Sequence, residues 1–71
     1  MPYDSIYDLP PAVRRLPAHG QEIFRAAFNA AWESYADRGE RAQEEIAHRV
    51  AWAAVKRRYR KVRGGWIEAG A

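Results

Sequence analysis

Two stretches with helical periodicity, separated by a short link that contains glycine, constrain the fold of this chain more than any other feature. In the first stretch, from Ala18 to about Tyr35, large apolar residues recur at steps of three and four positions. Residues spaced in this way fall on one face of a helix. Because the link at 37–40 is so short, the second helix must run back along the first. The pattern therefore predicts an antiparallel helical hairpin.

The second helix is expected from about Arg41 to Val62. One stripe of this helix holds His48, Trp52, Val55, Tyr59 and Val62, flanked by Ala47, Ala51 and Ala54. Small alanines allow the partner helix to approach closely while the aromatic side chains fill the flanks. Gly64-Gly65 is expected to end the helix.

The link should contain its own start and stop signals. Gly39 is expected to adopt the left-handed conformation that ends a helix, and Asp37 with Glu40 has the spacing of a capping box for the next helix. Gly20 is a weak position in the first helix, since glycine costs about 1 kcal/mol of helix propensity relative to alanine.

The two ends of the chain are expected to add smaller elements. Proline suits the first turn of a helix, so Pro10 and Pro11 predict a helix of one or two turns, which Pro17 closes. The alternation at Tyr3–Ile6 predicts a short strand that pairs with Trp66-Ile67. The predicted fold is mainly α: a short N-terminal helix, a long antiparallel helical hairpin and a small two-stranded β patch that joins the N- and C-termini.

A chain of 71 residues without cysteine supports one domain, 1–71, with one modest core and no disulfide. Large aromatic side chains must supply much of that core. The expected core residues are Ile23, Phe24, Phe28, Trp32, Tyr35, Val50, Trp52, Val55, Tyr59 and Trp66. The aromatic stripe of the first helix could instead form a partner surface, but so small a chain has little else from which to build a core.

The sequence offers no set of residues suited to catalysis or to holding a cofactor. The only serines are Ser5 and Ser34, and neither neighbours a histidine. Glu45-x-x-His48 has the spacing of half a metal site in carboxylate bundles, but the partner helix supplies no inward carboxylates. We therefore expect no enzyme, no metal and no cofactor, and interpret His48 as a hydrogen-bonded residue at the edge of the core.

Charge is distributed unevenly along the chain. Residues 1–40 carry four basic and six acidic side chains, whereas residues 41–71 carry eight basic and three acidic ones. The candidate binding residues are Lys56, Arg57, Arg58, Arg60, Lys61 and Arg63. Six cations at a helix end exceed what the helix dipole requires. They favour contact with an acidic protein or membrane surface or with nucleic acid.

Neither a membrane span nor a signal peptide is expected. No apolar run approaches the roughly 20 residues that span a bilayer. The first eight residues lack the charged and apolar regions of a secretion signal. The expected location is the cytoplasm.

The ordered motifs of the chain resemble the ChaB family, small bacterial proteins known as cation transport regulators. The resemblance rests on Met1-Pro2-Tyr3, Leu9-Pro10, Leu16-Pro17-Ala18-His19, the run from Gln21 to Trp32, the run from Glu45 to Lys56, Tyr59 and Gly65-Trp66. The chain departs from the family pattern in its short interhelical link, in Gly20 at a position where alanine is usual, and in its unusually basic last helix.

The resemblance implies a mainly helical domain with a small sheet joining the two ends, and it supplies no catalytic residues. It also implies a regulatory or adaptor protein that acts on a calcium or sodium/proton antiporter through protein contacts. The basic last helix keeps a nucleic-acid-binding module as the alternative.

Overall fold

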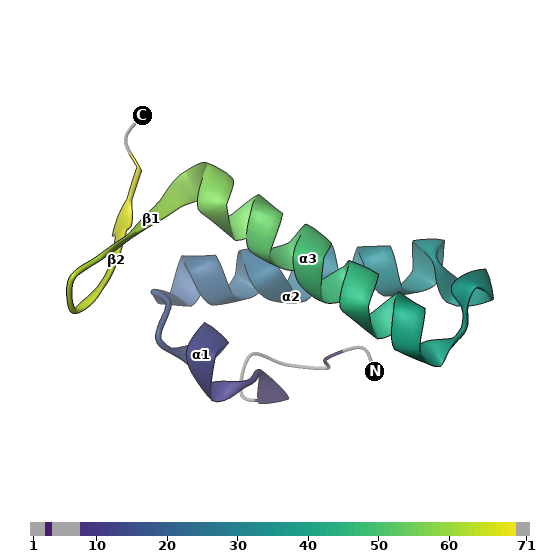
Figure 1. The fold of residues 1–71 in the computed structure, drawn as a ribbon. Helices are drawn as coiled ribbons and strands as arrows, with labels where there is room; N and C mark the ends of the chain where they lie inside the picture. Colours follow the sequence, from purple (N-terminus) through teal and green to yellow (C-terminus); the bar gives the residue numbers. More distant parts are fainter. Residues whose placement is uncertain (1–2, 4–7, 70–71) are drawn as a thin grey trace.

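Two long antiparallel helices, α2 (Ala18–Ser34) and α3 (Glu40–Arg58), form the body of the protein. The computed structural model describes Tyr3 and residues 8–69. A short helix, α1 (Pro11–Arg14), precedes the pair, and the strands β1 (Tyr59–Val62) and β2 (Gly65–Glu68) follow it. Figure 1 shows α2 and α3 side by side, with α1 and the β-hairpin at the end where α2 begins. The predicted mainly α fold with a long helical hairpin is confirmed.

The prolines set the boundaries of the first two helices. Pro11 lies in the first turn of α1, and Pro17 precedes α2, so no helical hydrogen bond is lost at either position. The side chain of Gln21 donates hydrogen bonds to the carbonyl oxygens of Arg14 and Leu16, at 3.1 and 2.8 Å. These bonds satisfy carbonyls at the end of α1 and fix the angle at which α2 begins.

The link between α2 and α3 contains a short 3-10 helix, η2 (Ala36–Arg38), and then Gly39. Gly39 has φ 89° and ψ 149°, a conformation that only glycine adopts readily. The predicted left-handed helix end is wrong, because this ψ lies outside the left-handed region and Gly39 directly precedes α3, whereas α2 ends at Ser34. The predicted capping box is wrong, because Glu40 is already the first residue of α3 and no side chain caps this helix. Gln43 instead donates a 2.6 Å hydrogen bond to the carbonyl of Trp32, near the end of α2.

The C-terminal end of α3 differs most from the sequence prediction. The helix ends at Arg58 rather than Val62, because Tyr59 adopts extended angles and begins β1. β1 pairs with β2 through Tyr59↔Glu68, Arg60↔Ile67, Lys61↔Trp66 and Val62↔Gly65. This register leaves two residues, 63 and 64, in the turn, and Gly64 has φ 86°.

One prediction about the C-terminal residues is therefore wrong, because Gly64-Gly65 serves a strand turn and not a helix end. The small two-stranded sheet is present, and in it β2 pairs with β1. The predicted pairing of Trp66-Ile67 with Tyr3–Ile6 falls on residues 4–6, which lie outside the described residues. Tyr, Val, Trp and Ile favour strands, and a tight turn satisfies the backbone of both strands locally.

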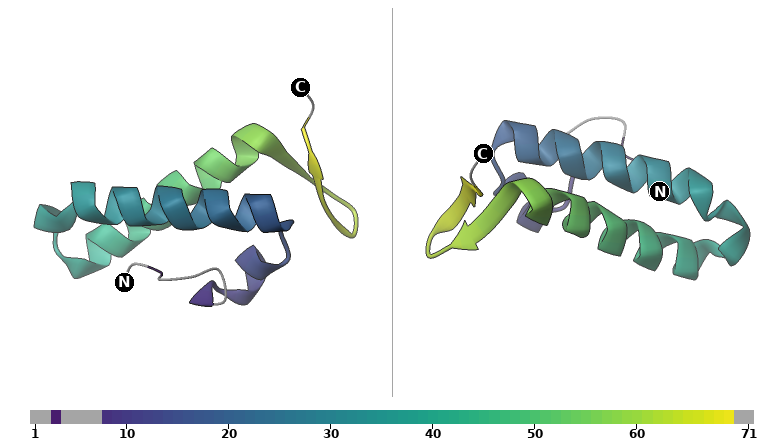
Figure 2. Two further views of the ribbon diagram at one scale, coloured as in Figure 1. Left: turned by 180° about the vertical axis from the view of Figure 1, so that it is seen from behind. Right: turned by 90° about the horizontal axis from the view of Figure 1, so that it is seen from above.

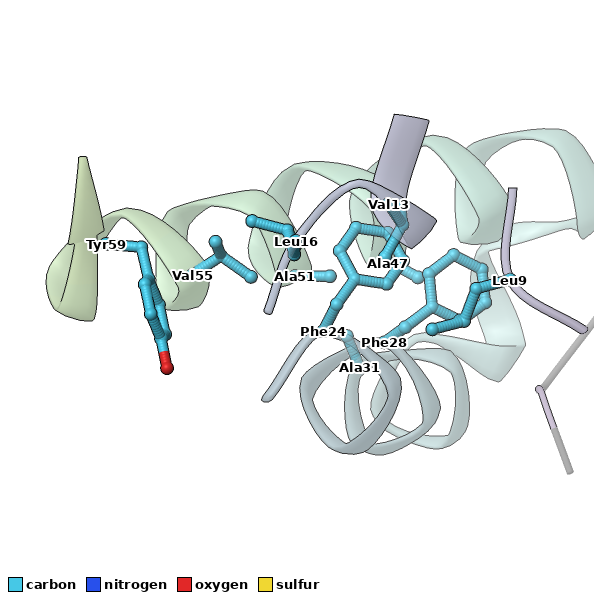
Figure 3. Packing of buried hydrophobic residues seen from close by; sticks show 10 residues of the cluster. All are labelled: Leu9, Val13, Leu16, Phe24, Phe28, Ala31, Ala47, Ala51, Val55 and Tyr59. Atoms are coloured by element: carbon cyan, nitrogen blue, oxygen red, sulfur yellow. The ribbon is translucent and has the colours of Figure 1, made fainter. Parts of the chain in front are cut away.

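The core lies between α2, α3 and the segment around α1. Figure 3 shows Phe24 and Phe28 reaching from α2 toward Ala47, while Val13 closes the cluster from α1. The buried hydrophobic residues are Leu9, Val13, Leu16, Phe24, Phe28, Ala31, Ala47, Ala51, Val55 and Tyr59. Alanines on α3 therefore face phenylalanines on α2, as close helix packing requires.

The remaining expected core residues have two outcomes. Ile23, Trp32, Tyr35, Trp52 and Trp66 are partly buried and pack against the core cluster. Val50 is 39% exposed, so its assignment to the core is wrong. Ala47 and Ala51 are buried on the face that meets α2, whereas Val50 on the same helix remains exposed.

The hairpin is attached to the body through Tyr59, which is 5% exposed. A Cβ atom at Gly20 would lie 3.2 Å from the Leu16 Cβ and 3.4 Å from the Tyr59 Cε2. The Tyr59 ring thus lies directly on α2 beside Gly20, and the closest neighbour that an added Cβ atom would meet is Leu16. The Tyr59 hydroxyl also shares a 3.2 Å hydrogen bond with His19 Nδ1.

Candidate partner-binding site

Six exposed cations surround the junction between α3 and the β-hairpin. Lys56, Arg57 and Arg58 occupy the last turn of α3, whereas the other three lie on β1 and in the turn. Within the described residues, none of the six forms an ion pair with an acidic side chain. The helix dipole can stabilise only the first three, because its effect falls off within one turn.

The strand pairing divides this cluster between two faces of the hairpin. Side chains alternate across a strand, so Lys61 shares a face with its partner Trp66 and with Tyr59. Tyr59 is buried and Trp66 contacts α3, so this face is turned toward the body. Arg60 and its partner Ile67 lie on the opposite face, where Ile67 is 42% exposed. A continuous helix, as predicted from the sequence, would not have separated Lys61 from Arg60 in this way.

A groove of about 770 Å³ lies where α1, the end of α3 and the hairpin meet. Figure 2 shows the hairpin beyond the end of the helical pair, on the side where the chain enters α2. The described residues that line the groove are Ala12, Arg15, Trp52, Lys56, Lys61, Val62, Gly64, Gly65 and Trp66. Three of them are cations, and none is acidic.

The groove brings together only part of the predicted cluster and adds a residue that sequence reasoning missed. Lys56 and Lys61 line it, whereas Arg57, Arg58, Arg60 and Arg63 do not appear among its described lining residues. Arg15 reaches the groove from the end of α1. No sequence signal identified Arg15, since only the tertiary fold places α1 beside the hairpin.

Two stacked indole rings lie in the same groove. The ring centroids of Trp52 and Trp66 are 5.7 Å apart with an interplanar angle of 21°. Trp52 also meets Phe24 edge to face at 5.2 Å, which connects the pair to the buried core. Both tryptophans remain partly exposed. The result is a firmly held apolar surface next to positive charge.

A second hollow, of about 350 Å³, lies at the other end of α3 and includes the residues of the metal hypothesis. Its described lining residues are Tyr3, Phe28, Arg41, Glu44, Glu45 and His48. Within the described residues, no three His, Cys, Asp or Glu side chains are placed to hold a metal ion.

His48 does not have the environment expected from the sequence. Its ring meets Phe24 and Phe28 edge to face, at 5.7 and 5.8 Å. The buried Nδ1 atom makes no hydrogen bond in the described structure, so the expected hydrogen-bonded residue is wrong in that respect. The ring therefore acts mainly as part of the aromatic packing.

Comparison with known proteins agrees with this architecture. The sequence profile of the ChaB family matches residues 9–69. The chain belongs to the ChaB family. A protein of Escherichia coli named "Putative cation transport regulator ChaB" is 50% identical over 66 residues, covering 86% of this chain and 87% of that protein. The resemblance seen in the sequence is thereby confirmed.

Two further relatives extend the comparison. The NMR solution structure of a protein also named putative cation transport regulator ChaB shares 43% identity with a TM-score of 0.84, covering 97% of this chain and 100% of that one. An uncharacterized 10.9 kDa protein of Lymantria dispar multicapsid nuclear polyhedrosis virus is 34% identical, covering 94% of this chain and 64% of the viral protein. Among the described residues, no helix has the length and apolarity needed to cross a membrane.

Proposed function

We propose that this ChaB-family protein is a non-enzymatic regulatory module that docks its basic end onto an acidic cytoplasmic surface of a cation antiporter. The observation that carries the proposal is the group of six exposed cations gathered at one end of the molecule. Charges without an acidic partner among the described residues attract an acidic surface over a distance of about 8–10 Å in salt solution. The name of the Escherichia coli relative identifies cation transport as the process to test.

The proposal assigns no chemistry to the protein. The described residues provide no group of side chains placed to hold a metal ion, and the six cations are exposed. Docking of this kind changes a transporter only if the bound protein favours one of its conformations over another. Regulation and binding must therefore be measured together.

The test uses a cation/proton antiporter from the same organism in inverted membrane vesicles. Purified protein is expected to bind the vesicles and to change the rate of cation/proton exchange. Replacing all six cluster cations by glutamine should abolish both effects, and raised salt should weaken them. Unchanged binding and exchange with the sixfold variant would exclude the proposed function.

A matched pair of variants separates the cluster from net charge. Replacing Arg57, Arg60 and Arg63 by glutamine removes three charges from the cluster. Replacing Arg14, Arg41 and Arg49, which are exposed elsewhere, removes three charges from other surfaces. Only the first variant should lose activity in the vesicle assay.

Binding to duplex DNA, measured at several salt concentrations, tests the alternative function of a nucleic-acid-binding module. If the cluster binds DNA, log affinity should fall with log salt at a slope of about −0.9 per phosphate contacted. Such binding, together with no effect on the antiporter, would replace the proposed function with a nucleic-acid role.

A further inference from the structure

We infer that the groove between α1, the end of α3 and the hairpin binds an acidic segment of a partner protein, with one apolar side chain of that segment seated against the Trp52–Trp66 pair. This inference rests on the proposed function and identifies the contact within the basic end that recognises the partner. It divides the six cations into two lysines that line the groove and four arginines outside its described lining.

The charge of the groove is complementary to an acidic segment. Arg15 directly follows α1, Lys56 lies on α3 and Lys61 lies on β1, and the three side chains line one hollow. None of the described lining residues is acidic. Cations on several sides of a groove fix the register of a bound acidic chain, whereas a flat basic surface would only attract it.

The apolar surface formed by Trp52 and Trp66 indicates that the ligand carries an apolar side chain between its acidic groups. The two indole rings stack on each other at 5.7 Å, and Trp52 is also held by Phe24 at 5.2 Å. A nucleic-acid base usually stacks on an aromatic face along a track of cations. Here the tryptophans already stack on each other and the cations surround a single hollow, so an apolar side chain of a peptide suits the groove better.

The test measures binding of a labelled, capped peptide in which one leucine lies between flanking glutamates. The expected result is saturable binding at moderate salt that becomes about tenfold weaker when the leucine is replaced by glycine, because the apolar contact is lost. In a Trp32→Phe background the only remaining indoles are Trp52 and Trp66, so their emission should shift on binding.

Two matched double variants test the position of the site. Lys56→Glu with Lys61→Glu and Arg57→Glu with Arg60→Glu each change one helical and one strand cation, and both lower the net charge equally. The first pair should weaken binding by about tenfold or more, and the second by clearly less. Circular dichroism verifies that both variants keep their helices.

The outcomes separate the groove from the cluster as a whole. Equal losses in the two double variants, or no dependence on the leucine of the peptide, would overturn the groove as the binding site and would leave the proposed function to the antiporter assay. Binding of duplex DNA but not of the peptide would overturn it in favour of nucleic acid. Loss of regulation in the sixfold variant with an inactive groove would support the proposed function alone.

Discussion

The interior of the α2–α3 pair and the hairpin end are constructed in opposite ways. In the interior, Phe24, Phe28, Ala47 and Ala51 are almost completely buried, with at most 1% of their surface exposed. At the hairpin end only Tyr59 is buried, and the two tryptophans beside it remain partly exposed. The first region excludes water, whereas the second leaves apolar and charged groups available for contact.

This difference indicates that stability and binding are located in different parts of the same helices. α3 contributes alanines to the interior from its middle and one cation, Lys56, to the groove from its last turn. Substitutions in the interior should therefore destabilise the whole protein, whereas substitutions at the hairpin end should weaken only the contact between the hairpin and α2. The predictions below test that separation in order of decreasing effect.

Phe28→Ala should cause the largest loss of stability. The ring is 1% exposed and contacts Tyr3, Phe24, Trp32 and His48, so its removal leaves a large cavity. Such substitutions cost about 3–5 kcal/mol, which is comparable to the stability of so small a domain. Urea unfolding followed by circular dichroism measures the effect. Ile67→Ala, at a 42% exposed position, should change the free energy of unfolding by less than about 0.5 kcal/mol. Similar losses in both variants would contradict the separation.

Gly20→Leu should detach the hairpin from α2. Even a Cβ atom at this position would lie 3.4 Å from the Tyr59 ring, so a larger side chain must displace it. Overpacking of this kind costs about 1–3 kcal/mol. Gly20→Ala is the matched control, in which crowding against Leu16 opposes a gain in helix propensity of about 1 kcal/mol. Urea unfolding gives the two free energies, and NMR shifts of the hairpin show whether it has moved. Wild-type shifts in Gly20→Leu would show that Tyr59 does not hold the hairpin in the way described.

Tyr59→Phe tests the polar part of the same attachment. It removes the hydroxyl that shares a 3.2 Å hydrogen bond with His19 Nδ1 and leaves the ring in place. A hydrogen bond of this kind contributes about 0.5–1.5 kcal/mol. Adding His19→Ala to Tyr59→Phe should cost little more than the larger single loss, since one bond serves both residues. Fully additive losses in the urea-unfolding cycle would indicate that the bond contributes nothing.

The helical body could be predicted from the sequence because its signals are local. Prolines at 10, 11 and 17, the apolar period of α2 and the glycine at 39 each act within a few residues of themselves. α2 begins and ends within one residue of its expected bounds, and α3 begins within one residue of its expected start. The family resemblance rested on the same local motifs.

The groove could not be predicted, because it depends on where α3 stops. Tyr59 and Val62 are three positions apart, a spacing that places both on one face of a helix but on opposite faces of a strand. Because the two residues continue the apolar stripe of α3, the sequence was interpreted as helical up to Val62. Once β1 begins at Tyr59, Lys61 turns toward Trp66, and Arg15 comes near both through tertiary contact. The six cations were visible in the sequence, but their division between groove and open surface was not.

Alkaline pH should produce the smallest effect, at Tyr3. Asn29 binds the backbone of Tyr3 at both its N–H and its carbonyl, at 2.8 Å each, and the Tyr3 ring packs on Phe28 at 4.8 Å. Burial, and then the negative charge of Glu44, raises the pKa of the Tyr3 phenol above its ordinary 10.0.

The unfolded chain therefore loses this proton at a lower pH than the folded one. The stabilisation is fully present below pH 10 and is lost as the pH rises through the higher folded pKa. Tyr3→Phe has no such proton, so its free energy of unfolding, measured in urea across this range, should decline less steeply than that of the wild type. Parallel curves would mean that the Tyr3 hydroxyl is as well solvated in the folded protein as in the unfolded chain. The Tyr3 side chain would then be accessible to water, like the side chains at the hairpin end and unlike those in the helical interior.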